Sequence, residues 1–196
     1  MPNWCYNQTV FYGNKRTTTR LYRELEKVID YKKDCHIDKF FKLLGVPQEK
    51  LNEEYNTRAF ICNFDINKEN NALILSYESA WNPIIEDLNK ILKKYKPSLK
   101  QVTWSEECGC GIYINTDREG LYFTDRYYLD MSTEGGNDWN DNKYFNCLED
   151  AIKAFKEFYE VNTEITTEEE LRKEISKVRD RYDDDVYITF DEFTDY

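Results

Sequence analysis

The pattern of apolar and polar residues divides the first part of the chain into a strand, a helix and a short insertion. Residues 3–12 are rich in aromatic and β-branched types and stop at Gly13-Asn14, which predicts a strand followed by a turn. Behind the candidate cap residues 17–19, apolar positions form one helical stripe. The stripe consists of Leu21, Leu25, Val28 and Ile29. Residues 34–54 repeat a shorter helical pattern and predict a small helical insertion.

A hairpin and a second helix come next. Residues 58–66 and 72–80 have strand composition and are joined by a polar connection, which predicts a hairpin. Asn82 followed by Pro83 is a favourable helix opening, because the Asn side chain can cap the first turn and Pro lacks an N–H that this turn leaves unpaired. Pro97 ends the predicted helix.

The rest of the chain alternates between strand-like runs and helices. The runs are 99–104, 111–115, 121–131 and 186–193. A turn over 106–109 separates the first two runs, and a polar loop over 132–142 follows the third. Two helices precede the last run, and the second begins with Thr167 and Glu170 at the spacing of a capping box.

This element order predicts an α+β fold. A β-α-β-β-α-β order is typical of a ferredoxin-like core, in which helices cover one face of a mostly antiparallel sheet. We expect this core over residues 1–135, with the helical insertion at about 34–54. Residues 136–196 are expected to form an acidic helical extension that packs on the core as one structural unit. The 196 residues, 40% of them hydrophobic, suffice for one such domain.

Composition also bears on location and on the cysteines. The start MPNWCYNQTV lacks the basic and apolar regions of a signal peptide, and no stretch approaches the ~18 apolar residues that cross a bilayer. We therefore expect a cytoplasmic protein with no membrane partner. The 6 cysteines are scattered along the chain, and we interpret them as mostly reduced thiols.

The formal net charge of −11 is distributed unevenly. Residues 1–105 contain 17 Lys and Arg against 13 Asp and Glu, a net charge of +4. Residues 106–196 contain 10 against 25, a net charge of −15. Because summed charge steers association, the two halves are expected to attract different partners.

Three short motifs resemble a known family. They are Pro2-Asn3-Trp4-Cys5 with Asn7, Ser79-Ala80-Trp81-Asn82-Pro83, and Thr103-Trp104-Ser105-Glu106-Glu107 with Gly109 and Gly111. They are similar to the YubB-type (Api-like) ferredoxin-fold family of phage and plasmid proteins, in pieces over residues 1 to about 135. The chain departs from that family in the insertion at 34–54, which stands in place of a Trp-rich motif, and in residues 160–196. The resemblance implies a ferredoxin-like fold and a mobile-element context, and it carries over no catalytic residue.

Candidate catalytic and metal-binding residues are few. Cys108-x-Cys110 is the one close cysteine pair and His36 the one histidine, whereas a structural zinc site usually draws on two paired ligand clusters. No Gly-x-Ser-x-Gly motif accompanies His36, which disfavours hydrolase chemistry. Gly109-Cys110-Gly111 has no following helix and favours a tight turn over a phosphate site. We expect no catalytic residue, no metal ligand and no cofactor.

Clustered carboxylates leave one enzymatic alternative open. Glu106-Glu107 and Asp183-Asp184-Asp185 could hold a divalent cation for a metal-assisted nuclease, if converging strands brought such side chains together in a cleft. A run of charges is normally a solvated edge. We therefore favour binding over catalysis.

The favoured hypothesis is a non-enzymatic interaction protein of a phage or mobile element. It binds and inhibits a host protein, such as a defence or nucleic-acid-binding protein, through an acidic surface and an exposed aromatic corner. The candidate binding residues are Trp81, Asn82, Trp104, Glu106, Glu107, Trp139, Asp183, Asp184 and Asp185. The acidic half disfavours nucleic acid as a direct partner. The main alternative is a small-ligand or nucleotide-binding domain with a pocket near residues 81–83 and 106–111.

Overall fold

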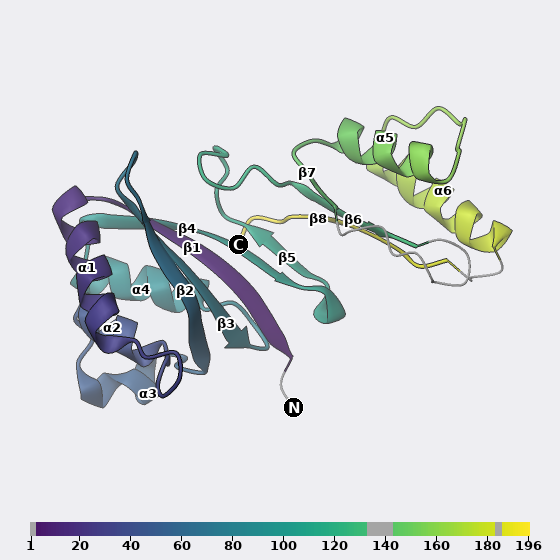
Figure 1. Ribbon diagram of the computed structural model, residues 1–196. Coiled ribbons are helices and arrows are strands. Elements are labelled where there is room, and N and C mark those ends of the chain that lie inside the picture. Colours follow the sequence, from purple (N-terminus) through teal and green to yellow (C-terminus); the bar gives the residue numbers. More distant parts are fainter. Residues whose placement is uncertain (1–2, 133–142, 183–185) are drawn as a thin grey trace. The chain divides into compact units, whose positions relative to one another are not determined.

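The computed structural model describes residues 3–132, 143–182 and 186–196, in two compact units (Figure 1). The N-terminal unit comprises Met1–Asp117 with Tyr196, and the C-terminal unit comprises Arg118–Asp195. Each unit contains helices and one antiparallel sheet. The predicted mixed α+β class with antiparallel sheets is therefore confirmed.

The sheet of the N-terminal unit has the strand order β2-β3-β1-β4-β5, and every neighbouring pair is antiparallel. The strands are β1 (Trp4–Gly13), β2 (Ala59–Asn67), β3 (Ala72–Ala80), β4 (Leu99–Glu107) and β5 (Ile112–Asn115). The pairing of β2 with β3 confirms the predicted hairpin. The first strand of the chain lies in the middle of the sheet, where β3 and β4 pair with its two edges.

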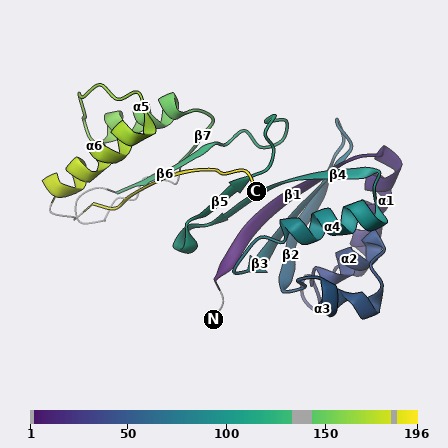
Figure 2. The same cartoon turned by 180° about the vertical axis from the view of Figure 1, so that it is seen from behind.

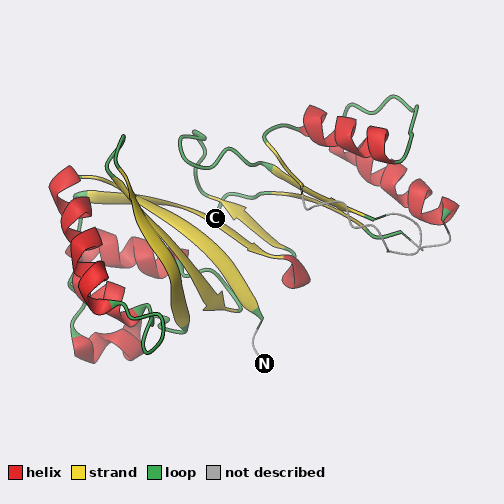
Figure 3. Ribbon diagram, in the orientation of Figure 1, coloured by secondary structure: helices red, strands yellow, loops and turns green. Residues whose placement is uncertain are grey.

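The helices of this unit lie on one face of its sheet (Figures 2 and 3). They are α1 (Lys15–Val28), α2 (Asp38–Leu44), the 3-10 turn η1 (Gln48–Lys50), α3 (Leu51–Glu54) and α4 (Ile85–Tyr95). Phe11, Phe40 and Phe41 are fully buried where the helices meet the sheet. The apolar stripe of α1 forms because Leu21 and Leu25 are four residues apart and project toward Phe11 and its neighbours.

The C-terminal unit has a smaller sheet of order β7-β6-β8. Its elements are β6 (Tyr127–Met131), β7 (Lys143–Phe145), α5 (Leu148–Phe158), α6 (Glu168–Arg181) and β8 (Ile188–Glu192). Leu129, Phe155 and Val178 are fully buried in its core. The predicted capping box is present, since the Thr167 side chain accepts from the Glu170 N–H and the Glu170 side chain accepts from the Thr167 N–H.

The division between the two units differs from the sequence-based one. The predicted core ended near residue 135 and formed one unit with the rest of the chain, whereas the structure divides after Asp117. The reason is that β6 pairs with β7 and β8, far along the chain, instead of joining the larger sheet. The predicted strand 121–131 is also shorter, because its pairing with β7 and β8 begins only at Tyr127, and the carbonyls of Phe123 and Asp125 accept from the Arg126 guanidinium instead.

Two helix starts and one strand end also differ. Asn14 caps α1 by accepting from the Thr17 N–H at 3.1 Å, so residues 17–19 lie inside the helix. Helix α4 begins at Ile85 without a side-chain cap, so Asn82 is not its cap. Glu106 and Glu107 belong to β4, and the turn that follows is η2 (Cys108–Cys110).

Two further observations concern the whole described part. None of its helices combines the length and apolar character needed to cross a membrane. All 6 cysteines have free thiols.

Candidate functional site

The two faces of the larger sheet carry different side chains, because successive strand residues point to opposite sides. On the face away from the helices, one row of register partners crosses all five strands in the order Phe60, Glu78, Tyr6, Glu106 and Tyr113. Partners directly opposite one another in antiparallel strands project on the same face. Two carboxylates therefore flank the ring of Tyr6.

Further aromatic rings surround this row. The Trp4 and Phe60 rings meet edge to face with centroids 5.4 Å apart, and Tyr6 meets Trp104 in the same way at 6.2 Å. Trp4 is 40% exposed and Tyr6 is 37% exposed. We call Trp4, Tyr6, Phe60, Glu78 and Glu106 the aromatic–acidic face. It combines accessible rings with carboxylates on a rigid sheet.

Trp81 forms a corner at the end of β3, next to this face. Its φ of 72° lies in the left-handed region, which is costly for a residue with a bulky side chain. The Trp81 N–H donates to the Asn3 carbonyl at 2.8 Å, and the Ser79 hydroxyl donates to the Asn82 carbonyl at 2.8 Å. These bonds hold the corner and leave the Trp81 side chain 47% exposed.

A buried polar network on the opposite face holds three strands in register. Asn7 Nδ2 donates to Ser79 Oγ at 2.9 Å, and Ser105 Oγ donates to Asn7 Oδ1 at 2.7 Å. Thr9 and Thr103 share a hydrogen bond of 2.7 Å one row away. Because Tyr6 directly precedes Asn7 on β1, the network also holds the backbone that carries Tyr6.

Cys5 belongs to the same buried region and is not suited to nucleophilic chemistry. Burial, together with the nearby Glu107 and Glu106 carboxylates, raises the pKa of the Cys5 thiol to about 12. The thiolate is the reactive form of cysteine. Cys5 therefore stays a protonated, structural thiol at neutral pH.

Glu106 and Glu107 do not converge on one site. Glu106 lies in the row that includes Tyr6, on the face away from the helices, whereas Glu107 is the next strand residue and points to the side of Cys5. The Glu107 carboxylate lies against the turn that follows β4. Its Oε1 atom is 3.0 Å from the position that a Cβ atom on Gly109 would occupy. Among the residues that the structure describes, no three His, Cys, Asp or Glu side chains are grouped as metal ligands.

The other predicted binding residues have different environments. Trp104 is only 8% exposed, so it does not belong to an exposed corner. Trp139 and the run Asp183-Asp184-Asp185 lie outside the described residues. The structure thus brings Trp81 and Glu106 to the same end of one sheet and adds Tyr6, together with Trp4, Phe60 and Glu78, which the sequence did not indicate as binding residues. The strand register of β1 would have been needed to find them.

A groove lies beside the Trp4 end of this face, with a volume of about 600 Å³. Its lining residues are Trp4, Asp34, His36, Asp38, Gln48, Leu51, Thr57, Arg58 and Phe60. The segment before α2 follows the outer edge of β2, since the Ile61 N–H donates to the Cys35 carbonyl and the Ile37 N–H donates to the Ala59 carbonyl. This pairing sets the His36 ring against Phe60, with centroids 4.4 Å apart. We call this the His36 groove.

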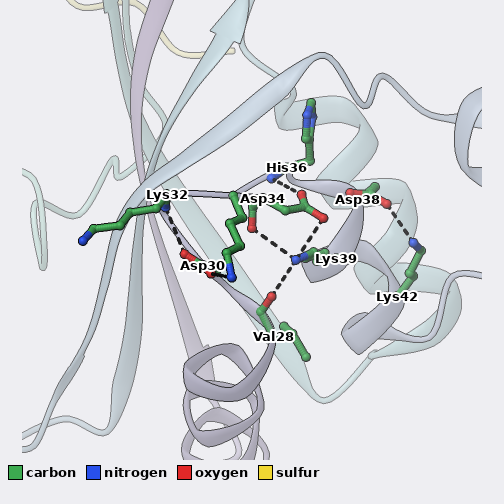
Figure 4. Close-up of polar contacts among 9 residues, drawn as sticks. Val28, Asp30, Lys32, Asp34, His36, Asp38, Lys39 and Lys42 are labelled. Carbon is green, nitrogen blue, oxygen red and sulfur yellow. Dashed lines mark hydrogen bonds and ion pairs between the residues drawn. The ribbon is translucent and has the colours of Figure 1, made fainter.

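Lys39 fixes the segment that carries His36 (Figure 4). Its Nζ donates to the Val28 carbonyl at 2.7 Å and to the Asp34 carbonyl at 3.1 Å, and it lies 3.0 Å from Asp34 Oδ2. The hydrogen bond from Lys39 lowers the pKa of the Asp34 carboxyl. In Figure 4 the His36 ring points away from these contacts.

No protein-family model, no curated protein and no solved structure matches the chain. Its function is therefore inferred from the side chains described above.

Proposed function

We propose that the protein is a non-enzymatic interaction protein whose aromatic–acidic face binds a cationic segment of a partner protein. The observation that carries the proposal is the row in which Glu78 and Glu106 flank Tyr6, with the Trp4 ring nearby. Aromatic faces attract Lys and Arg side chains, and carboxylates form charge-assisted hydrogen bonds with them. Exposed aromatic residues are also the usual anchors of protein interfaces.

The proposed partner is a host protein with a basic surface, such as a nucleic-acid-binding or defence protein, which the binding inhibits. The charge of the C-terminal unit supports this choice, because residues 118–196 contain 10 Lys and Arg against 22 Asp and Glu. The electrostatic field of this negative charge speeds encounters with positively charged partners.

The family resemblance extends the proposal to a phage or mobile-element protein that acts in the host cytoplasm. The strand order β2-β3-β1-β4, with α1 and α4 covering one face, supports a ferredoxin-like assignment for the N-terminal unit. The metal-assisted nuclease alternative is weakened, because its candidate metal-binding carboxylates Glu106 and Glu107 lie on opposite faces of β4.

The direct test is binding of a fluorescently labelled, arginine-rich peptide, measured by anisotropy at low and high salt. We expect binding that weakens with salt and falls roughly tenfold in the double variant Glu78→Gln/Glu106→Gln. Glu53→Gln is the matched control, because Glu53 is an exposed carboxylate of α3 on the helix-covered side. Equal losses in the control and the double variant would contradict the proposal.

The partner itself can be sought with the same variants. A host protein that wild type captures from lysate is accepted as the partner only if the double variant Glu78→Gln/Glu106→Gln fails to retain it while Glu53→Gln does retain it. A partner retained by all three proteins would place the interface elsewhere.

A further inference from the structure

The His36 groove has the chemistry of a small-molecule site that the aromatic–acidic face does not explain. Its volume of about 600 Å³ is within the usual range for ligand pockets. Three features distinguish it, namely a wall of aromatic rings, an arginine with no ion pair among the described residues, and a rigid support.

The aromatic wall comes from three separate segments. Phe60 stands at its centre, with the Trp4 ring 5.4 Å away edge to face and the His36 ring 4.4 Å away. Trp4 belongs to β1, Phe60 to β2 and His36 to the segment before α2. Rings gathered in this way can stack on a planar ligand, because every aromatic ligand ring offers a π-face.

The charges of the groove leave one cation uncompensated. Asp34 pairs with Lys39 at 3.0 Å and Asp38 pairs with Lys42 at 2.8 Å, so these four charges balance. The Arg58 guanidinium is exposed and, within the described residues, takes part in no ion pair or side-chain hydrogen bond. A guanidinium presents donors in a planar fork that matches a carboxylate or a phosphate group.

The support of the groove is preorganised. The backbone carbonyl of Arg58 accepts from the Ala80 N–H at 2.9 Å, which ties the start of β2 to the end of β3. Lys39 holds the opposite wall through its contacts with Val28 and Asp34. A site whose walls are already fixed loses little conformational entropy when a ligand enters.

We propose that the His36 groove binds a small molecule that joins a planar ring to a phosphate or carboxylate group. The ring stacks on one ring of the wall and meets the others at their edges, since Trp4 and His36 are tilted by 61° and 49° to Phe60, and Arg58 binds the anion. Gln48 and Thr57 add polar side chains to the lining. This site uses Arg58 and His36, so its test is independent of Glu78 and Glu106 in the proposed protein interface.

The test uses purified full-length chain with adenosine, guanosine, cytidine and uridine monophosphates as probes. Binding is followed by quenching of tryptophan fluorescence and by isothermal titration calorimetry. We expect saturable binding of at least one nucleotide, and a loss of tenfold or more in affinity in Arg58→Ala. Arg20→Ala is the matched control, since Arg20 is an exposed arginine of α1 that does not line the groove.

Separate measurements distinguish the parts of the ligand. Inorganic phosphate and the free nucleosides should each bind at least tenfold more weakly than the nucleotide, because each occupies half of the site. Trp4→Phe should abolish most of the quenching while leaving the calorimetric signal measurable. Arg58→Lys keeps the positive charge but loses the planar fork of guanidinium donors, so it should bind more weakly than wild type. Circular dichroism checks that each variant is folded.

Three outcomes would overturn the proposal. They are absence of binding for all four nucleotides, equal losses in Arg58→Ala and Arg20→Ala, and binding of inorganic phosphate as tight as that of the nucleotide.

Discussion

In the N-terminal unit, four strands of 9 or 10 residues pair side by side, whereas the strands of the C-terminal unit have only 3 to 5 residues. Both sheets are antiparallel and both units contain packed helices. The long strands bring many register partners together, and that length makes room for a buried polar network on one face and the row that includes Glu78, Tyr6 and Glu106 on the other. The short strands described in the C-terminal unit give rows of at most three register partners.

The two units also differ in net charge. Residues 1–117 contain 17 Lys and Arg against 16 Asp and Glu, and residues 118–196 contain 10 against 22. The acidic character of the chain therefore belongs to the C-terminal unit, while the best-defined candidate sites belong to the nearly neutral N-terminal unit. Charge imbalance and site geometry are separate properties, and the charge acts on a partner at longer range than the side chains of a site do.

The largest effect is expected from removing one core ring in each unit. Phe155→Ala should destabilise the C-terminal unit by about 3–5 kcal/mol, because Phe155 is fully buried and its loss leaves a cavity. Three of the four tryptophans (Trp4, Trp81 and Trp104) belong to the N-terminal unit, so fluorescence mainly reports that unit during urea unfolding. Circular dichroism should show an early transition that fluorescence largely lacks.

Phe40→Ala is the reciprocal variant, since Phe40 is fully buried in the N-terminal core. It should lower the fluorescence transition and leave the dichroism of the C-terminal helices in place. If each variant lowered both transitions equally, the two units would unfold as one cooperative body and the comparison would fail.

A smaller effect should follow from breaking the polar network. Asn7→Ala should destabilise the N-terminal unit by about 3 kcal/mol, because it removes the acceptor of the buried Ser105 hydroxyl and one of the two hydrogen bonds of Ser79 Oγ. Gln8→Ala is the control on the same strand, since Gln8 makes one weak bond of 3.4 Å to Ser76. Urea unfolding followed by fluorescence should separate the two variants, and equal losses would show that the network adds no specific stability.

Much of this fold could be predicted from local patterns. Apolar periodicity found the helices, and β-rich runs bounded by turn residues found the β2–β3 hairpin, because these signals depend on neighbours in sequence. Glu106 and Glu107 were assigned to a turn because charged residues interrupted the strand pattern. Pairing with β1 and β5 extends β4 through both of them. Such pairing depends on distant segments that local composition does not reveal.

The candidate sites were harder to predict for the same reason. The row through Glu78, Tyr6 and Glu106 exists only once three strands are in register, although each strand was recognised. The sequence raises His36 only as a possible metal ligand or hydrolase base, and nothing in its local sequence indicates contact with Phe60. The sequence predicts an aromatic corner around Trp81, Trp104 and Trp139. Trp81 is 47% exposed, Trp104 is only 8% exposed, and Trp139 lies outside the described residues.

Asp130 offers a test of intermediate size in the C-terminal unit. It is buried, and no donor from the described residues reaches its Oδ1 atom. Desolvation raises the pKa of the Asp130 carboxyl, so folding disfavours its charged form. Asp130→Asn should therefore stabilise the C-terminal unit by roughly 1–2 kcal/mol at neutral pH.

The pH dependence of this gain has a defined sign. Because the pKa of Asp130 is higher in the folded state than in the unfolded state, the cost of the charged form is present at neutral pH and disappears as the pH falls through the folded pKa. The stability difference between Asp130→Asn and wild type should shrink accordingly on acidification. A difference that stays constant with pH, measured by urea unfolding under dichroism, would assign the gain to something other than charge.

The smallest effect is expected at the start of α6. Thr167→Ala removes the side chain that accepts from the Glu170 N–H, and loss of a cap costs about 1 kcal/mol. Hydrogen bonds from Thr166 and Thr167 lower the pKa of the Glu170 carboxyl, so its contribution is present above the unfolded pKa and is lost as the pH falls through the folded pKa. Glu170→Gln should remove this acid-side loss in urea unfolding of the C-terminal unit, opposite in sign to the effect at Asp130. Thr9→Ala, in the buried network of the N-terminal unit, should leave that acid-side loss intact, because the two units have separate cores.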